Sequence, residues 1–238
     1  MKEIIQRNFD LSPAKYDEYE RLTGRFASLA SRLYHEMAAR AAVPLETVLD
    51  AGAGTGISSE EITARGATPI ALDLSHRMLG SNPAADRVQG DFDQLPFVSD
   101  SFDAVAFTAS LFLTPKPDRA VTEARRVLCS GGTVGAVVPL GWRTKAGEDV
   151  FEQLSRTSRS PTDADAVERA LRTEFDIETG RWSFETSPNA LRAFHSVPAM
   201  AARLYPKEEP SERIRRANEL LTEVDEPLEQ HWRWFVGT

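Results

Sequence analysis

Three glycines at alternate positions follow a short apolar run near residue 50. The segment VLDAGAGTG, residues 48–56, contains Gly52, Gly54 and Gly56, and the polar stretch SSEE that follows it is typical of a helix start. Glycines allow a ligand to approach the backbone closely, and open α/β sheets bind ligands at the carboxyl ends of their strands. A dinucleotide fingerprint would need glycine in place of Ile57, which weakens the case for a pyrophosphate site. For the glycines alone, a tight turn without a ligand is also a fair interpretation.

Acidic residues close the first three apolar runs. Asp73 ends the run 68–73 and lies 23 positions after Asp50, where a carboxylate can accept both hydrogen bonds of a ribose diol. Asp91 ends the third run, where a carboxylate could accept from an exocyclic amine and the ring of Phe92 could cover a base. Each acid alone is typical of a helix cap or a solvated turn. Three acids at successive strand ends favour a ligand site.

The elements that would position these residues alternate between strand and helix. Apolar runs that end in polar or glycine-rich turns predict strands at 47–50, 68–73, 87–90, 102–107 and 133–138. A helical pattern starts at Pro117 and reaches Gly131-Gly132. This alternation predicts an α/β fold with a doubly wound, mostly parallel sheet.

The chain on either side of this region has a different rhythm. An apolar stripe from Tyr19 to Met37 predicts one leading helix that ends before Pro44. The later elements are a helix from a capping box at 162–165 to residue 171, a strand at 175–184 with a turn at Gly180, helices at 188–204 (interrupted at Pro198) and 211–224, and a closing strand at 231–236. Residues 206–210 are expected to form an exposed connection.

We therefore expect one domain over residues 1–238. Residues 1–43 form an N-terminal helical lid, 44–139 the ligand-binding half, and 140–238 a substrate half whose small helical cap, around 188–225, is inserted before the last strand. The sheet should have seven strands.

Composition excludes several classes of function. Lys and Arg number 28 against 36 Asp and Glu, and the resulting net charge of −8 argues against a surface built mainly to bind nucleic acid. One cysteine, Cys129, cannot form an intrachain disulfide, and four scattered histidines give no zinc-site spacing, so no metal is expected. The amino-terminal residues lack the apolar core of a signal peptide, and no uncharged stretch is long enough to span a bilayer. We expect a cytoplasmic protein without membrane insertion.

Four motifs in order resemble those of the class I S-adenosylmethionine-dependent methyltransferases, specifically the type 11 small-molecule group. They are VLDAGAGTG, ALDLSHRML, GDFDQLPFVSDSFDAV and RRVLCSGG, and the resemblance covers about residues 9–139. It implies that S-adenosyl-L-methionine is the cofactor. A ligand that carries a sulfonium and an ammonium but no phosphate suits a segment that is rich in carboxylates and has no basic residue in its glycine turn.

The resemblance also implies roles for individual residues. The three glycines would line the cofactor, Asp73 would hold the ribose, Met78 would pack on the adenine, and Asp91 and Phe92 would contact its edge and face. The whole set expected at the cofactor comprises Asp50, Gly52, Gly54, Gly56, Asp73, Leu74, Met78, Asp91, Phe92 and Phe107.

The acceptor is less clearly indicated. An Asn/Asp-Pro-Pro-aromatic motif, common in enzymes that methylate amines of nucleic acids and proteins, is absent after the fourth strand at 107–110. A small-molecule or acyl-carrier-bound acceptor is therefore expected, and the layout beyond residue 139 resembles that of malonyl-carrier-protein O-methyltransferases. Tyr16, in a segment that resembles the lid helix of such enzymes, and Arg192 and His195 in the cap are candidate catalytic residues, although ordinary packing or surface roles are at least as good an interpretation.

Three alternatives stay open at this point. A protein or RNA methyltransferase should show a basic or peptide-sized groove. A catalytically silent S-adenosylmethionine sensor would have the cofactor site without turnover. A nicotinamide oxidoreductase is disfavoured by Ile57. The oligomeric state is not indicated.

Overall fold

The computed structural model describes residues 2–156, 158 and 160–238, which are built around one seven-stranded sheet. The strand order is β3-β2-β1-β4-β5-β7-β6, and only β7 runs antiparallel to its neighbours. The strands are β1 (Thr47–Ala51), β2 (Thr68–Asp73), β3 (Asp86–Gln89), β4 (Phe102–Phe107), β5 (Leu128–Thr144), β6 (Ile177–Thr186) and β7 (Leu228–Gly237). The predicted seven-stranded, mostly parallel sheet is confirmed.

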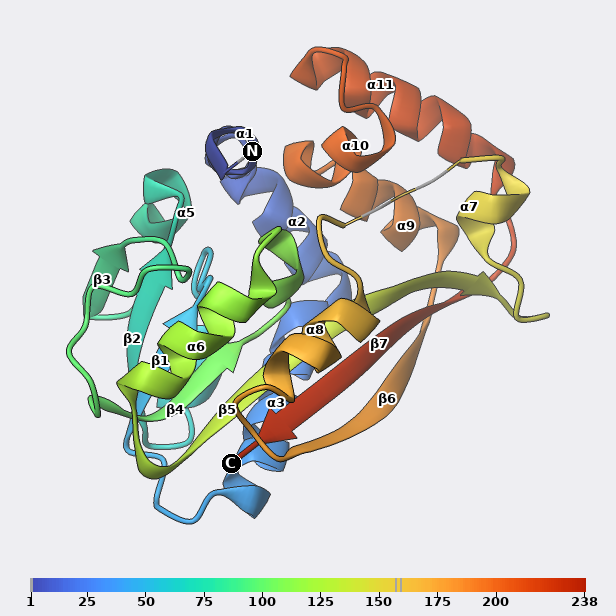
Figure 1. Cartoon of the computed structure of the whole chain (residues 1–238). Helices are drawn as coiled ribbons and strands as arrows, with labels where there is room; N and C mark the ends of the chain where they lie inside the picture. Colours follow the sequence, from blue (N-terminus) through green and yellow to red (C-terminus); the bar gives the residue numbers. More distant parts are fainter. Residues whose placement is uncertain (1, 157, 159) are drawn as a thin grey trace.

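Helices cover both faces of this sheet (Figure 1). In the view drawn, α6 and α8 lie in front of the sheet and α3 lies behind it, where it packs against β5, β7 and α4. The helices that flank the sheet are α3 (Arg25–Arg40), α4 (Ile57–Thr63), α5 (His76–Gly80), α6 (Pro117–Val127), α7 (Val150–Gln153) and α8 (Ala164–Leu171). None of the helices that the structure describes has the length and apolar character needed to span a bilayer.

A second group of helices gathers above the upper ends of the strands in Figure 1. It comprises α1 (Lys2–Asp10), α2 (Pro13–Thr23), α9 (Pro188–His195), α10 (Pro198–Leu204) and α11 (Pro210–Leu220). The cap formed by α9, α10 and α11 lies between β6 and β7 in the chain, where the sequence predicts it. Contacts of α1 with α10 and of α2 with α9 join the amino-terminal helices to this cap.

The single leading helix that the apolar stripe predicts is in fact two helices. Gly24, with φ of +57°, separates α2 from α3 in the left-handed region that favours glycine. The carboxylate of Glu20, which is buried, then accepts hydrogen bonds from the backbone N–H groups of Phe26 (2.8 Å) and Ala27 (3.0 Å). Glu20 thus caps the first turn of α3 from the preceding helix.

Other local expectations also differ from the structure. Gly180 lies inside β6, not in a turn, and pairs with Trp234; a Cβ there would lie 2.6 Å from the indole nitrogen of Trp234, so only glycine lets this ring cross the strand. The N-cap of α8 is Asp163, whose carboxylate accepts from the N–H of Ala166, and not Thr162. The predicted break at Pro198 is confirmed, because α10 begins there.

Candidate cofactor and acceptor site

A cavity lies where the carboxyl ends of β1, β2 and β4 meet the amino-terminal helices and the cap. Lys2, Ile5, Gln6 and Phe9 of α1 form one wall, and Gly52 and Gly54 form part of the opposite wall. Of the residues expected from the sequence, the structure brings eight to this cavity: Tyr16, Gly52, Gly54, Asp73, Leu74, Met78, Asp91 and Phe92. Five lie outside it: Asp50, Gly56, Phe107, Arg192 and His195.

The glycine turn brings backbone to the cavity because no side chain fits there. Gly52 has φ of +82°, and a Cβ on it would lie 2.4 Å from Cβ of Ser110, which in turn donates a hydrogen bond to the carbonyl of Ala51 (2.5 Å). Gly56 serves a different purpose: it precedes the first residue of α4, and a Cβ there would meet Asn82 and Pro83. The cavity is therefore lined by the first two glycines of the motif.

Asp73 ends β2 with both carboxylate oxygens held by the backbone. Oδ2 accepts from the N–H of Gly54 (2.9 Å) and Oδ1 from the N–H of Ser75 (2.8 Å). Burial raises the pKa of Asp73 to about 6, and the two N–H donors oppose that rise. Each oxygen of a carboxylate has a second lone pair, so Asp73 can accept two further hydrogen bonds from a ligand in the cavity.

Asp50 has a role behind the glycine turn. Its Oδ2 accepts from the hydroxyls of Ser58 (2.6 Å) and Ser59 (2.7 Å), which ties the end of β1 to the first turn of α4. The residue is fully buried, and this burial raises its pKa to about 6. Asp50 therefore shapes the glycine turn and does not line the cavity.

Asp91 faces a lysine that the sequence interpretation missed. The ammonium of Lys2 lies 2.6 Å from Oδ1 of Asp91 and also pairs with Asp93. Phe92, next in the chain, packs edge-on against the buried ring of Phe107, with centroids 5.6 Å apart. The carboxylate that is expected to contact adenine is thus covered by the first turn of α1, and Phe107 supports Phe92 from behind the cavity.

Leu74 and Met78 supply the apolar part of the same wall. The buried hydroxyl of Ser75 accepts from the N–H of Met78 (3.1 Å) and so caps α5, and it donates to Asp10 of α1 (2.5 Å). The short helix α5 is thereby fixed with Met78 beside Gly54, at 3.3 Å from where a Cβ would be. These two residues form a surface on which a planar base could lie.

Tyr16 of α2 lines the cavity beside the start of α3. Its ring stacks on Phe26, with centroids 4.5 Å apart and an interplanar angle of 12°. Burial, together with the nearby carboxylate of Glu20, raises its pKa well above that of a free tyrosine. The phenol therefore keeps its proton at neutral pH and can donate a hydrogen bond in the cavity.

The two cap candidates lie elsewhere. Arg192 donates to the carbonyls of Leu221 and Val224 (both 3.3 Å), so it ties α9 to the chain that follows α11. His195 lines a neighbouring hollow, and its Nδ1 lies 3.0 Å from the carbonyl of Leu191, which assigns the proton to Nδ1. Burial lowers the pKa of His195 to about 4, so it is neutral at pH 7.

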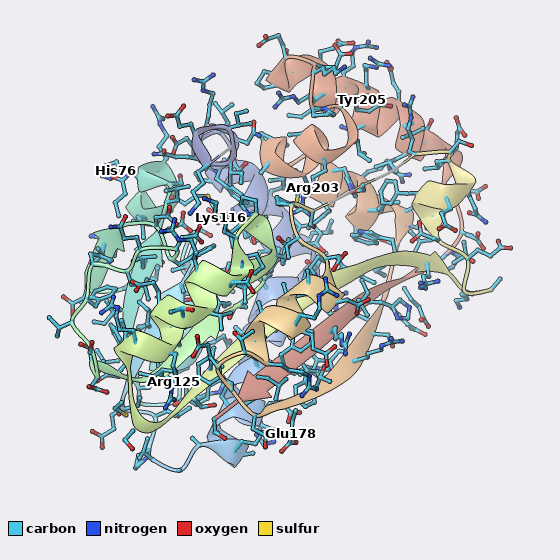
Figure 2. The ribbon with its side chains drawn as sticks, in the orientation of Figure 1. His76, Lys116, Arg125, Glu178, Arg203 and Tyr205 are labelled. Carbon is cyan, nitrogen blue, oxygen red and sulfur yellow. The ribbon has the colours of Figure 1, made fainter. Side chains whose placement is uncertain are left out.

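The cavity includes cap and strand residues that no motif indicated. Arg203 of α10 and Trp232 of β7 both line it. Figure 2 shows Arg203 beneath α10, between the cap and the sheet. Neither residue belongs to a recognisable pattern, and Lys2 lies 89 positions from Asp91, so only the fold brings them together.

Part of the chain is similar to known methyltransferases. Residues 49–135 match the family described as methyltransferase domain. Demethylmenaquinone methyltransferase of Thermobifida fusca is 40% identical over 136 residues, which are 52% of this chain and 56% of that protein. The corresponding protein of Mycobacterium tuberculosis H37Rv is 38% identical over 129 residues, 52% of this chain and 53% of that protein. The chain thus aligns with about half the length of these curated relatives.

Solved structures show the same fold over more of the chain. The YcgJ protein of Bacillus subtilis has a TM-score of 0.58 at 16% identity and covers 86% of this chain and 96% of its own. An N-methyltransferase 2 of Haemonchus contortus, solved with phosphomonomethylethanolamine and S-adenosylhomocysteine, has a TM-score of 0.55 at 16% identity, over 86% of this chain and 51% of that one. Residues 49–135 therefore match the methyltransferase domain family, and the chain shares the Rossmann-like fold of these solved structures.

Proposed function

We propose that this chain transfers a methyl group from S-adenosylmethionine to a small-molecule acceptor, and that the cavity beneath α1 holds the cofactor. The observation that carries the proposal is the meeting of Gly52, Gly54, Asp73 and Asp91 on one cavity at the carboxyl ends of the strands. Nearly half of each of these two curated relatives is not aligned to this chain, so their substrate is not transferred to it.

The cavity residues fit the parts of this cofactor. The backbone of Gly52 is open to close approach, Asp73 has lone pairs for a ribose diol, and Leu74 and Met78 present apolar surface for a base. The carboxylate of Asp91 can accept from an exocyclic amine. S-adenosylmethionine would supply an electrophilic methyl group on its sulfonium.

The protein's part in such a reaction is alignment and exclusion of water. Methyl transfer is an in-line displacement, so the acceptor must lie on the far side of the methyl from the leaving sulfur. Phe9 of α1, Tyr16 of α2, Phe194 of α9 and Trp232 of β7 supply aromatic rings to the cavity wall. Tyr16 keeps its proton, so it can orient an acceptor but cannot act as a general base at neutral pH.

A free small molecule is favoured over a carrier-bound acyl group because the described walls are mostly apolar and aromatic. The relatives named demethylmenaquinone methyltransferase are in agreement with a small organic acceptor. An acyl carrier, a protein or an RNA would instead bind to the outer surface of this chain. Turnover with a panel of free and macromolecular acceptors can distinguish the two cases.

The experiment combines binding with turnover. Calorimetry should show that S-adenosylhomocysteine binds and that NADH does not. Labelled S-adenosylmethionine is then offered with free acids, quinols, phenols, acyl carriers, peptides and RNA, and S-adenosylhomocysteine formation is followed. Turnover with a free small molecule supports the proposal. Tighter binding of NADH, turnover only with a macromolecule or carrier, or cofactor binding without turnover on any acceptor would each contradict it.

A further inference from the structure

Two buried hydrogen-bond donors at the cavity have no partner. Among the described residues, the Nη2 atom of Arg203 and the Nε1 atom of Trp232 are buried and form no hydrogen bond, and both residues line the cavity. Leaving a buried donor unpaired costs about 1–3 kcal/mol, and more when the donor is charged. Since both orphan atoms of cavity-lining residues are donors, the missing partner is an acceptor.

The surroundings of Arg203 differ from those of the chain's paired arginines. Arg40, Arg126 and Arg233 each form an ion pair with a glutamate, whereas no ion pair of Arg203 is found in the part of the chain that the structure describes. The guanidinium instead lies 5.3 Å from the ring centroid of Phe112. Burial lowers the pKa of Arg203 to about 10, so the side chain is still charged at neutral pH. A buried positive charge without a partner is destabilising, and a bound anion would neutralise it.

Arg203 borders two hollows in the described part of the chain. Together with Pro139 and Phe194 it borders both the cofactor cavity and a second hollow, which is lined further by Trp142 and Phe151. A molecule in this hollow would meet these two aromatic rings and the guanidinium of Arg203. Acidic residues line the same hollow and would repel an anion placed among them, so the anionic group of such a molecule must lie at Arg203; they are Asp149, Glu152, Asp163 and Asp165. The side chains of Pro139, Phe194 and Arg203 thus lie between the cofactor cavity and this hollow.

We propose that Arg203 and Trp232 bind an anionic oxygen of an aromatic acceptor, either a carboxylate or an ionised phenol or enol, and hold the acceptor against the cofactor. This inference rests on the proposed function for the identity of the second ligand, but the anion site is tested by itself. It replaces Arg192, which the sequence suggested, with an arginine eleven positions further along the cap. The planar guanidinium suits two parallel hydrogen bonds to such a group.

The probes are 2-naphthoate, its neutral methyl ester and 4-nitrophenolate, measured by calorimetry at mildly alkaline pH with and without saturating S-adenosylhomocysteine. We expect 2-naphthoate or 4-nitrophenolate to bind the unmodified protein more tightly than the ester, and the preferred anion tells carboxylate from phenolate. Arg203→Met should weaken binding of that anion at least tenfold, and Trp232→Phe should weaken it severalfold. Neither of these two substitutions should alter binding of the neutral ester.

Controls separate this site from general charge and from folding. Arg169→Met removes a charge from an exposed position of α8 that lines neither hollow, and it should change anion binding less than twofold. Arg203→Met should not lower the melting temperature, because it removes an unpaired buried charge; Arg203→Lys, which keeps the charge, provides a second variant if it does. Failure of both anions to bind the unmodified protein, or equal binding of the preferred anion to Arg203→Met, would overturn the inference. Failure of S-adenosylhomocysteine to bind would overturn the proposed function alone.

Discussion

The pKa of Asp73 makes cofactor affinity dependent on pH in a window that the structure defines. With a pKa of about 6, the carboxyl is almost fully ionised at pH 8, whereas only about one molecule in ten is ionised at pH 5. A protonated carboxyl becomes a donor at one oxygen and cannot accept from both backbone N–H groups and a diol. We expect the affinity for S-adenosylhomocysteine to fall about tenfold from pH 8 to pH 5.

Replacing Asp73 by asparagine should remove this dependence. The amide has one acceptor oxygen, so its NH₂ group must face the N–H of either Gly54 or Ser75, donor against donor. Loss of hydrogen bonds to a charged group costs about 1.5–3 kcal/mol, which is about 10- to 150-fold in affinity. Asp86→Asn, on the exposed start of β3, is the matched control and should keep both the affinity and its pH profile.

Calorimetry across this pH range is the assay, with far-ultraviolet circular dichroism to verify folding. Stability of the ligand-free protein should change in the opposite sense. A carboxyl whose pKa is higher in the folded state than in the unfolded state loses stabilisation as pH rises from about 4 to about 6, and Asp50 adds to this trend. A wild-type affinity that is flat between pH 5 and 8, or an Asp73→Asn variant that binds within threefold of wild type, would refute the ribose role.

Two further predictions concern α1 and α3. Lys2→Gln removes a partly exposed ion pair with Asp91 that is worth at most about 1 kcal/mol, so hydrogen exchange of the α1 amides should become up to about fivefold faster. Lys15→Gln removes an exposed ion pair of α2 and should leave these rates unchanged. Equal rates in both variants would contradict the contact between α1 and Asp91. Glu20→Ala removes the cap of α3, so we expect a loss of about 1–2 kcal/mol of unfolding free energy and a melting temperature about 2–8 °C lower. A Glu18→Ala variant that loses as much stability would show that the cap is not responsible.

The sheet could be predicted because buried parallel strands are continuous apolar runs. β2 and β4 begin and end at the predicted residues, since polar turns punctuate them on both sides. The break at Gly24 could not be predicted in the same way, because the buried residues of α2 and α3 keep the helical spacing across it. The turn predicted at Gly180 was wrong for a related reason, because the role of this glycine depends on Trp234, which lies 54 positions later in the sequence.

The same division applies to the candidate site. Gly52, Asp73 and Asp91 belong to short motifs, so sequence alone indicates them. Lys2 and Arg203 reach the cavity from distant helices, and the choice between Arg192 and Arg203 depends on which way α9 and α10 turn. Helix periodicity gives the face on which a side chain lies but not the neighbour that this face meets.

The position of β7 in the chain determines the order in which the strands of the sheet can pair during synthesis. β6 pairs with the sheet only through β7, yet β7 comes after the whole cap in the chain. A growing chain on the ribosome can therefore assemble β1 to β5 while β6 still lacks its neighbour, and β6 waits with both edges open until residues 228–237 have emerged. Exposed strand edges of this kind are sites of chaperone capture and of aggregation. Slow codons after β6 would lengthen this interval, so translation speed across the cap becomes a determinant of yield.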